Sequence, residues 1–181
     1  MNALLLSLLL GTLYADEPAF IPYTPPGGTF TCELPPGWSA LEERSVRGIS
    51  SRMFGPRDDE RVRPAYHIHQ VQKDTPGFIP LMEGLKRELR CEGACARIAT
   101  PMQAWRISER GAKVFEVRES RLFPQETLPA EPVMLHHFYA FIPDKEDYFI
   151  VKLTVDEDAF DAYRSEFRRF LQKFRILSSR R

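Results

Sequence analysis

Residues 160–174 read Phe160-Asp-Ala-Tyr-Arg-Ser-Glu-Phe-Arg-Arg-Phe-Leu-Gln-Lys-Phe174. Large apolar side chains recur here every three or four residues with charged ones between them, which predicts an amphipathic helix. Asp156 or Asp158 is expected to cap its N-terminus, where acidic residues suit the helix dipole. An aromatic stripe this dense is typical of a helix that covers a β-sheet rather than of a cofactor site. The stripe consists of Phe160, Tyr163, Phe167, Phe170, Leu171 and Phe174.

The segments before this helix alternate in the manner of strands. Residues 133–142 are apolar on both faces, so we expect this strand to run inside the sheet. Helical spacing predicts a second helix that begins near Asp74 and ends near Gly93. These elements predict an α+β fold, a single antiparallel sheet of about six to seven strands flanked by helices in an α/β/α sandwich. The predicted strands cover residues 29–34, 47–54, 65–72, 102–108, 113–120, 133–142 and 148–155.

The first fifteen residues are uncharged and rich in leucine, and Asp16 and Glu17 follow at once. Residues 1–15 are therefore expected to be a signal peptide cleaved before Asp16, the alternative being a buried N-terminal helix. Cleavage would make the protein secreted or periplasmic, and no later stretch approaches the roughly 20 apolar residues of a membrane span. Residues 16–28 are expected to form a Pro/Gly-rich leader, and residues 29–181 a single globular domain.

Charge and cysteine content limit the possible partners. Lys plus Arg and Asp plus Glu number 25 each, so the net charge is zero and does not favour a nucleic acid partner. In an oxidising compartment Cys91 and Cys95 are expected to form a disulfide if the second helix ends near Gly93; the alternative is that all three cysteines are thiols. Cys32 is expected to be a buried, small apolar residue.

The four histidines occur as two pairs, one in each of two predicted strands. His67 and His69 project from one face of their strand, at a spacing compatible with joint metal binding. His137, or its neighbour His136, would join them if the two strands lie close together. No cofactor is expected, and a divalent metal at these histidines is the alternative. If no metal binds, the histidines are cross-strand polar pairs.

Motifs for catalysis are absent from the sequence. It contains no Gly-x-Ser-x-Gly, no His-Glu-x-x-His and no glycine-rich phosphate loop before a helix, so no catalytic residue is assigned. Trp38 and Trp105 are either interface anchors or residues at the edge of the core. The proline-rich loop of residues 122–132 is the segment expected to carry recognition, because irregular loops on a rigid scaffold often do.

Two short stretches resemble the PsbP family and its relatives, the DcrB-like periplasmic proteins and the Mog-type Ran-binding proteins. They are Phe30-Thr-Cys-Glu-Leu-Pro-Pro-Gly-Trp38 and Phe170-Leu-Gln-Lys-Phe-Arg-Ile-Leu177, and the order of elements is similar over residues 29–177. The resemblance implies an antiparallel sheet sandwiched by helices and a role in binding other macromolecules. It implies no ligand residue in this chain.

We therefore expect an exported, non-enzymatic binding domain whose partner is a protein and not a nucleic acid. The alternative is a histidine-dependent metal-binding protein or hydrolase, which requires His67, His69 and His137 to converge. A third hypothesis is a carrier of a small apolar ligand held between helix and sheet.

Overall fold

The computed structural model describes residues 19–45, 48–56, 61–72, 97–123 and 129–177. Among these residues there are eleven strands, one 3₁₀ helix, η1 (Glu157–Ala159), and one α-helix, α2 (Phe160–Lys173); the two helices lie between the tenth and eleventh strands. None of their helices is long and apolar enough to cross a membrane. The strands are β1 (Ile21–Tyr23), β2 (Phe30–Leu34), β3 (Ser39–Ser45), β4 (Gly48–Phe54), β5 (Ala65–Val71), β6 (Arg97–Ala99), β7 (Gln103–Ile107), β8 (Arg110–Phe123), β9 (Glu131–Asp144), β10 (Asp147–Asp156) and β11 (Arg175–Ile176).

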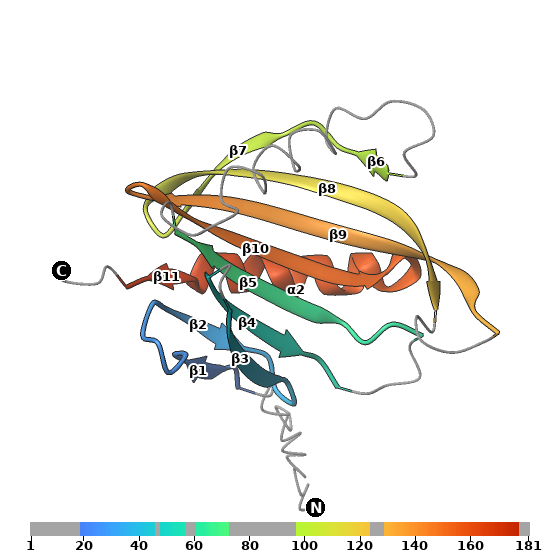
Figure 1. The fold of residues 1–181 in the computed structure, drawn as a ribbon, viewed down its shortest axis with the longest axis horizontal. Coiled ribbons are helices and arrows are strands. Elements are labelled where there is room, and N and C mark those ends of the chain that lie inside the picture. The colour runs from blue at the N-terminus through green and yellow to red at the C-terminus, as the bar shows by residue number, and fades with distance from the viewer. Residues whose placement is uncertain (1–18, 46–47, 57–60, 73–96, 124–128, 178–181) are drawn as a thin grey trace, which may run out of the picture.

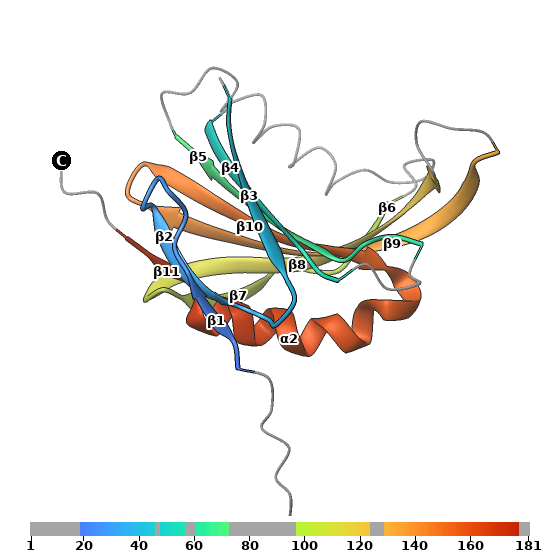
Figure 2. The same cartoon turned by 90° about the horizontal axis from the view of Figure 1, so that it is seen from below.

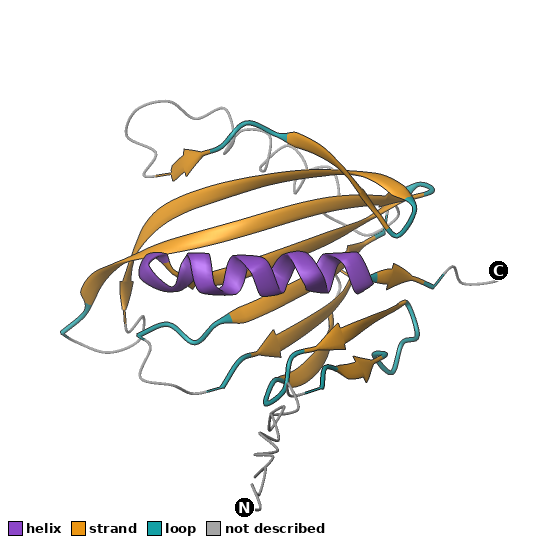
Figure 3. Ribbon diagram, turned by 180° about the vertical axis from the view of Figure 1, so that it is seen from behind, coloured by secondary structure: helices purple, strands orange, loops and turns teal. Residues whose placement is uncertain are grey.

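Most of the strands form one large antiparallel sheet, and α2 lies behind it in the view of Figure 1. It has eight strands in the order β3-β4-β5-β10-β9-β8-β6, with β7 also paired to β8. The strand β9 contains the doubly apolar residues 133–142 and lies between β10 and β8, as their pattern predicts. Figure 3 shows α2 lying across one face of this sheet.

A second, smaller sheet corrects the prediction of a single one. Its order is β1-β2-β11, so residues 29–34 contribute to β2 of this small sheet (Figure 2). The chain passes from β2 to the large sheet through the turn around Gly37, whose φ of +78° favours glycine. The strand β1 lies within the predicted leader of residues 16–28, which is therefore partly paired with the domain.

The core forms where the aromatic stripe of α2 meets the large sheet and β2. Phe167, Phe170 and Phe174 are fully buried, and Phe174 stacks on Phe30 of β2 with ring centroids 5.1 Å apart. Cys32, also on β2, is buried as predicted, and burial raises the pKa of its thiol to about 12.

The start of α2 differs from the prediction of an Asp156 or Asp158 cap. The N-cap residue is Ala159, without a side-chain cap, because η1 winds the preceding residues into a 3₁₀ turn. The second predicted helix, from Asp74 to Gly93, lies outside the described residues, as do residues 1–15 and the cysteines Cys91 and Cys95. The described residues thus define an α+β fold with two antiparallel sheets and with α2 on one face of the large sheet. An α/β/α sandwich, as predicted, would have a helix on each face of the sheet.

Candidate functional site

The three histidines of the predicted metal site lie on one face of the large sheet. His67 pairs with Lys152 of β10, and His137 pairs with Thr154 two residues further along the same strand. His69 follows His67 by two positions and so shares its face. This is the face opposite α2, because the alternate residues of β10, such as Leu153, belong to the core under the helix. The sequence correctly places His67 and His69 on a common face, and the strand register shows that His137 shares it.

His137 already has hydrogen-bond partners at both ring nitrogens. Its Nδ1 lies 3.0 Å from Thr154 Oγ1, and its Nε2 lies 3.0 Å from Glu119 Oε1. Arg121 contacts the same carboxylate oxygen at 2.6 Å. Burial is the main cause that lowers the pKa of His137, although the hydrogen bond to Glu119 raises it. A metal ion at His137 would have to displace one of these partners.

The surroundings of His67 are cationic, which also disfavours a metal ion. Burial lowers the pKa of His67 to about 3, with further contributions from the charges of Lys152 and Arg52 and from His137. The imidazole is therefore neutral near pH 7. No group of three or more His, Cys, Asp or Glu side chains within the described ranges is placed to hold a metal ion. The geometry of His67 and His137 fits the cross-strand polar alternative.

His136 points to the other face of the sheet, where it lies between two carboxylates. Its Nδ1 is 2.9 Å from Glu157 Oε2 and its Nε2 is 3.4 Å from Glu116 Oε2, while its ring stacks on Phe160. The same carboxylates pair with two arginines, Arg118 with Glu157 at 3.1 Å and Arg164 with Glu116 at 2.9 Å. The network connects β8, β9, η1 and α2. Sequence spacing did not reveal it, because its members come from four separate elements.

Trp38 and Trp105 both lie at the edge of the core. Trp38 stacks on Tyr66 with ring centroids 4.2 Å apart, and Trp105 meets Phe138 edge-on at 5.6 Å. Both indoles are partly buried. Both tryptophans are therefore packing residues that retain some exposed surface.

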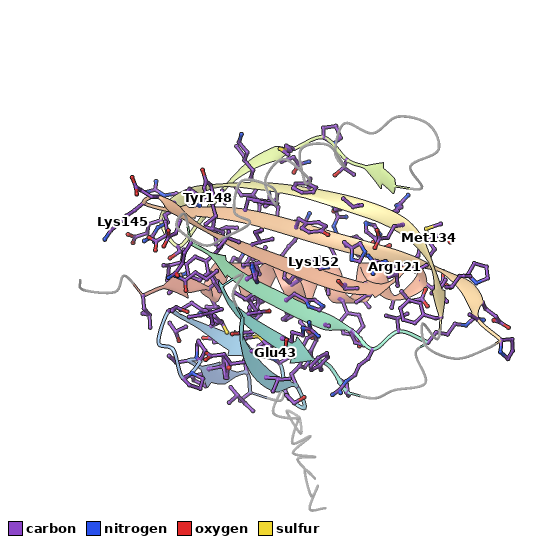
Figure 4. The ribbon with its side chains drawn as sticks, viewed as in Figure 1. Glu43, Arg121, Met134, Lys145, Tyr148 and Lys152 are labelled. Atoms are coloured by element: carbon purple, nitrogen blue, oxygen red, sulfur yellow. The ribbon has the colours of Figure 1, made fainter. Side chains whose placement is uncertain are left out.

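The predicted recognition loop, residues 122–132, is shorter than expected, because residues 122–123 belong to β8 and residues 131–132 to β9, while residues 124–128 lie outside the described residues. These two strands extend beyond the rest of the large sheet. Pairing with β6 ends at residue 119 of β8, and pairing with β10 begins at residue 135 of β9. Residues 120–123 of β8 and 131–134 of β9 therefore pair only with each other among the described residues. We call these two segments the ribbon end; Arg121 and Met134, labelled in Figure 4, lie on it.

One face of the ribbon end is packed and the other is exposed. Val133 and the partly buried Phe123 pack with Val62 and Leu135 in a small apolar cluster. On the opposite face Leu122 is 60% exposed and Met134 is 44% exposed. Because Leu122 pairs with Pro132, and Met134 with Ser120, the two exposed side chains are diagonal neighbours across the strands. The ribbon end thus presents an apolar pair on a packed base.

Among the described residues, no other two exposed large apolar side chains are neighbours across directly paired strands. Leu41 is on β3, at the opposite edge of the large sheet from β8. The others are Ile21, Met102 and Leu177.

Comparison with known proteins identifies the fold. No family model and no curated protein matches the sequence. Solved structures do match. Cyanobacterial PsbP (CyanoP) from Synechocystis sp. PCC 6803 is 14% identical with a TM-score of 0.55, over 91% of this chain and 96% of that one.

Two further solved structures share this arrangement. The Ran-binding protein Mog1p of Saccharomyces cerevisiae is 11% identical with a TM-score of 0.53, over 89% of this chain and 97% of that one. LpqN of Mycobacterium tuberculosis, described as involved in cell envelope biogenesis, is 14% identical with a TM-score of 0.52, over 88% and 91%. The chain therefore has the PsbP/Mog1-like fold, as the two sequence stretches indicated.

Proposed function

We propose that this protein is an exported binding domain that recognises another protein through its ribbon end. The observation that carries the proposal is the exposed pair Leu122 and Met134. An isolated exposed apolar residue is ordinary, but adjacent ones on a rigid base are typical of interaction surfaces. The other face of the ribbon end packs on Val62.

The fold is compatible with this role. One protein with the same fold is described as Ran-binding, so the architecture can serve protein recognition. Export is supported by the uncharged, leucine-rich residues 1–15. A protein partner is also favoured by the zero net charge, which provides no general attraction to nucleic acids.

The test is affinity capture from the exported fraction, with the captured proteins identified by mass spectrometry. The wild-type protein should retain a reproducible partner that the double variant Leu122→Asp, Met134→Asp does not retain. The matched control is Leu41→Asp, because Leu41 is similarly exposed, at 51%, but lies on β3. Capture that is unaffected by the ribbon-end substitutions, or equally weakened by Leu41→Asp, contradicts the proposal.

A further inference from the structure

The second half of α2 and the strand that follows it carry a cluster of exposed cations. We call Arg168, Arg169, Lys173 and Arg175 the basic face. Residues 156–161, at the other end of this segment, contain four acidic residues, whereas residues 168–175 contain none. A protein with zero net charge therefore has a strongly uneven distribution of charge along residues 156–175.

The helix dipole explains only part of this cluster. Cations stabilise the last turn of a helix, and Lys173 is the last residue of α2. Arg175, just beyond the helix, donates to the carbonyl oxygens of Gln172 and Phe174 at 2.6 and 2.9 Å. Arg168 and Arg169 lie more than a turn before the end, where the effect of the dipole has fallen off. They need another explanation.

Both of these arginines are held on aromatic rings. The guanidinium of Arg168 lies 5.6 Å from the ring centroid of Trp105, and that of Arg169 lies 3.8 Å from that of Phe20. Neither has an acidic partner within the described ranges. A stacked guanidinium loses less freedom when it binds a carboxylate, and its planar fork can bind both oxygens at once. The two side chains are thus arranged to receive carboxylates.

Little negative charge opposes the basic face. Glu33 lies 3.8 Å from Lys173. Both side chains are partly exposed to solvent, so this ion pair contributes little to stability. Glu166, on the same helix, points instead to the core, where Tyr66 donates to it at 2.9 Å. The basic face consequently has cations in excess. They are distributed across the exposed side of α2, with Arg168 turned towards Trp105 of β7 and Arg169 towards Phe20 beside β1.

We propose that the basic face binds an acidic segment of a partner protein, with Arg168 and Arg169 each engaging a carboxylate. From Arg168 to Lys173 the helix rises only about 8 Å, which suits a few consecutive Asp or Glu residues rather than an extended polyanion. The basic face is at the C-terminal end of α2, and the ribbon end lies beyond the opposite end of the helix (Figure 3). The two proposals are independent, and the failure of one leaves the other standing.

The experiment measures binding of a fluorescein-labelled octaglutamate peptide to the full chain by fluorescence anisotropy. The wild-type protein should bind it, and added salt should weaken the complex because exposed charges are screened. Arg168→Glu, Arg169→Glu should reduce the affinity about tenfold or more, as expected for the loss of charge-assisted contacts. The milder pair Arg168→Gln, Arg169→Gln removes the same contacts and serves if charge reversal impairs folding.

The matched control is Arg52→Glu, Lys113→Glu, which changes the net charge equally on the opposite face of the sheet. An equal loss of affinity in this control would show that the total charge, and not the basic face, is responsible, and would overturn the proposal. Wild-type affinity weaker than about 1 mM would overturn it as well. Binding to phosphatidylglycerol vesicles or single-stranded DNA but not to the peptide would refute an acidic protein segment as the ligand.

Discussion

Acidification is expected to destabilise the folded protein through the buried His67. Its pKa is about 3 in the folded protein, against 6.5 in the unfolded chain, because burial and the charges of Lys152 and Arg52 disfavour the protonated imidazole. Below pH 6.5 the unfolded state therefore binds a proton that the folded state does not. Stability is unaffected by this group above pH 6.5 and falls as the pH decreases towards 3.

The size of the effect follows from these two pKa values. Between pH 7 and pH 5 the unfolded state gains about 2 kcal/mol relative to the folded state from His67 alone. His67→Gln removes this titration. The variant should thus lose about 2 kcal/mol less than the wild type over the same interval, whatever its stability at pH 7. Lys152→Met should give a smaller change in the same direction, because it removes the largest contribution after burial.

The assay is urea unfolding followed by far-UV circular dichroism at pH 7 and pH 5, for the wild type and both variants. For each protein the change in unfolding free energy between pH 7 and pH 5 is taken, so the direct cost of the substitution cancels. His136 and His137 are retained in all three proteins. An equal loss of stability in wild type and His67→Gln would refute the reasoning, since His67 would then have the same pKa in the folded and unfolded states.

Three further predictions concern packing, a hydrogen bond and the ribbon end. Phe167→Ala should lower the free energy of unfolding by about 3–5 kcal/mol, because Phe167 is fully buried between α2 and the large sheet; a loss below about 1 kcal/mol in urea unfolding would contradict this. Tyr66→Phe should cost about 1 kcal/mol. It should also raise the pKa of Glu166 further, because burial already raises that pKa and the Tyr66 hydrogen bond opposes the rise; an NMR titration of the carboxyl carbon that finds no increase would refute it. Leu122→Asp should change the unfolding free energy by no more than about 0.5 kcal/mol, since the side chain is exposed, and a larger loss in urea unfolding would show that Leu122 is a packing residue.

The sequence predicts the large elements well because they have a strong hydrophobic period. The aromatic stripe identifies α2, and the doubly apolar residues 133–142 identify an interior strand. The edge strand β3 is missed because its sequence, Ser-Ala-Leu-Glu-Glu-Arg-Ser, lacks an apolar face and its Leu41 is exposed. The strands β1, β6 and β11 have two or three residues each, too few for a periodic signal.

The turn between β7 and β8 shows that local backbone conformation does not follow from amino-acid composition alone. The predicted strands 102–108 and 113–120 leave residues 109–112 as their connection, whereas the strands pair up to Ile107 and Arg110 and the turn is at Ser108 and Glu109. Both of these residues have positive φ, of 50° and 63°, which side chains other than glycine seldom adopt. Ser108 is nevertheless favoured there, because its Oγ accepts a hydrogen bond from the Ile176 amide of β11 at 2.9 Å.

The candidate sites required the register of the strands. Alternation alone placed His67 and His69 on one face, and it allowed either His136 or His137 to join them. Only the pairing of His137 with Thr154 decides between the two, and only the fold brings Glu119 to the ring of His137. The exposed neighbours Leu122 and Met134 are likewise twelve residues apart in sequence and adjacent through the pairing of β8 and β9.

The most direct test of protein recognition by the ribbon end is amide hydrogen exchange in the presence and absence of the captured partner. The partner should slow exchange at residues 120–123, 131, 133 and 134, which pair only within the ribbon end among the described residues, and should leave β3 unchanged. Protection confined to other parts of the chain, with the ribbon end exchanging as in the free protein, would contradict the proposed function.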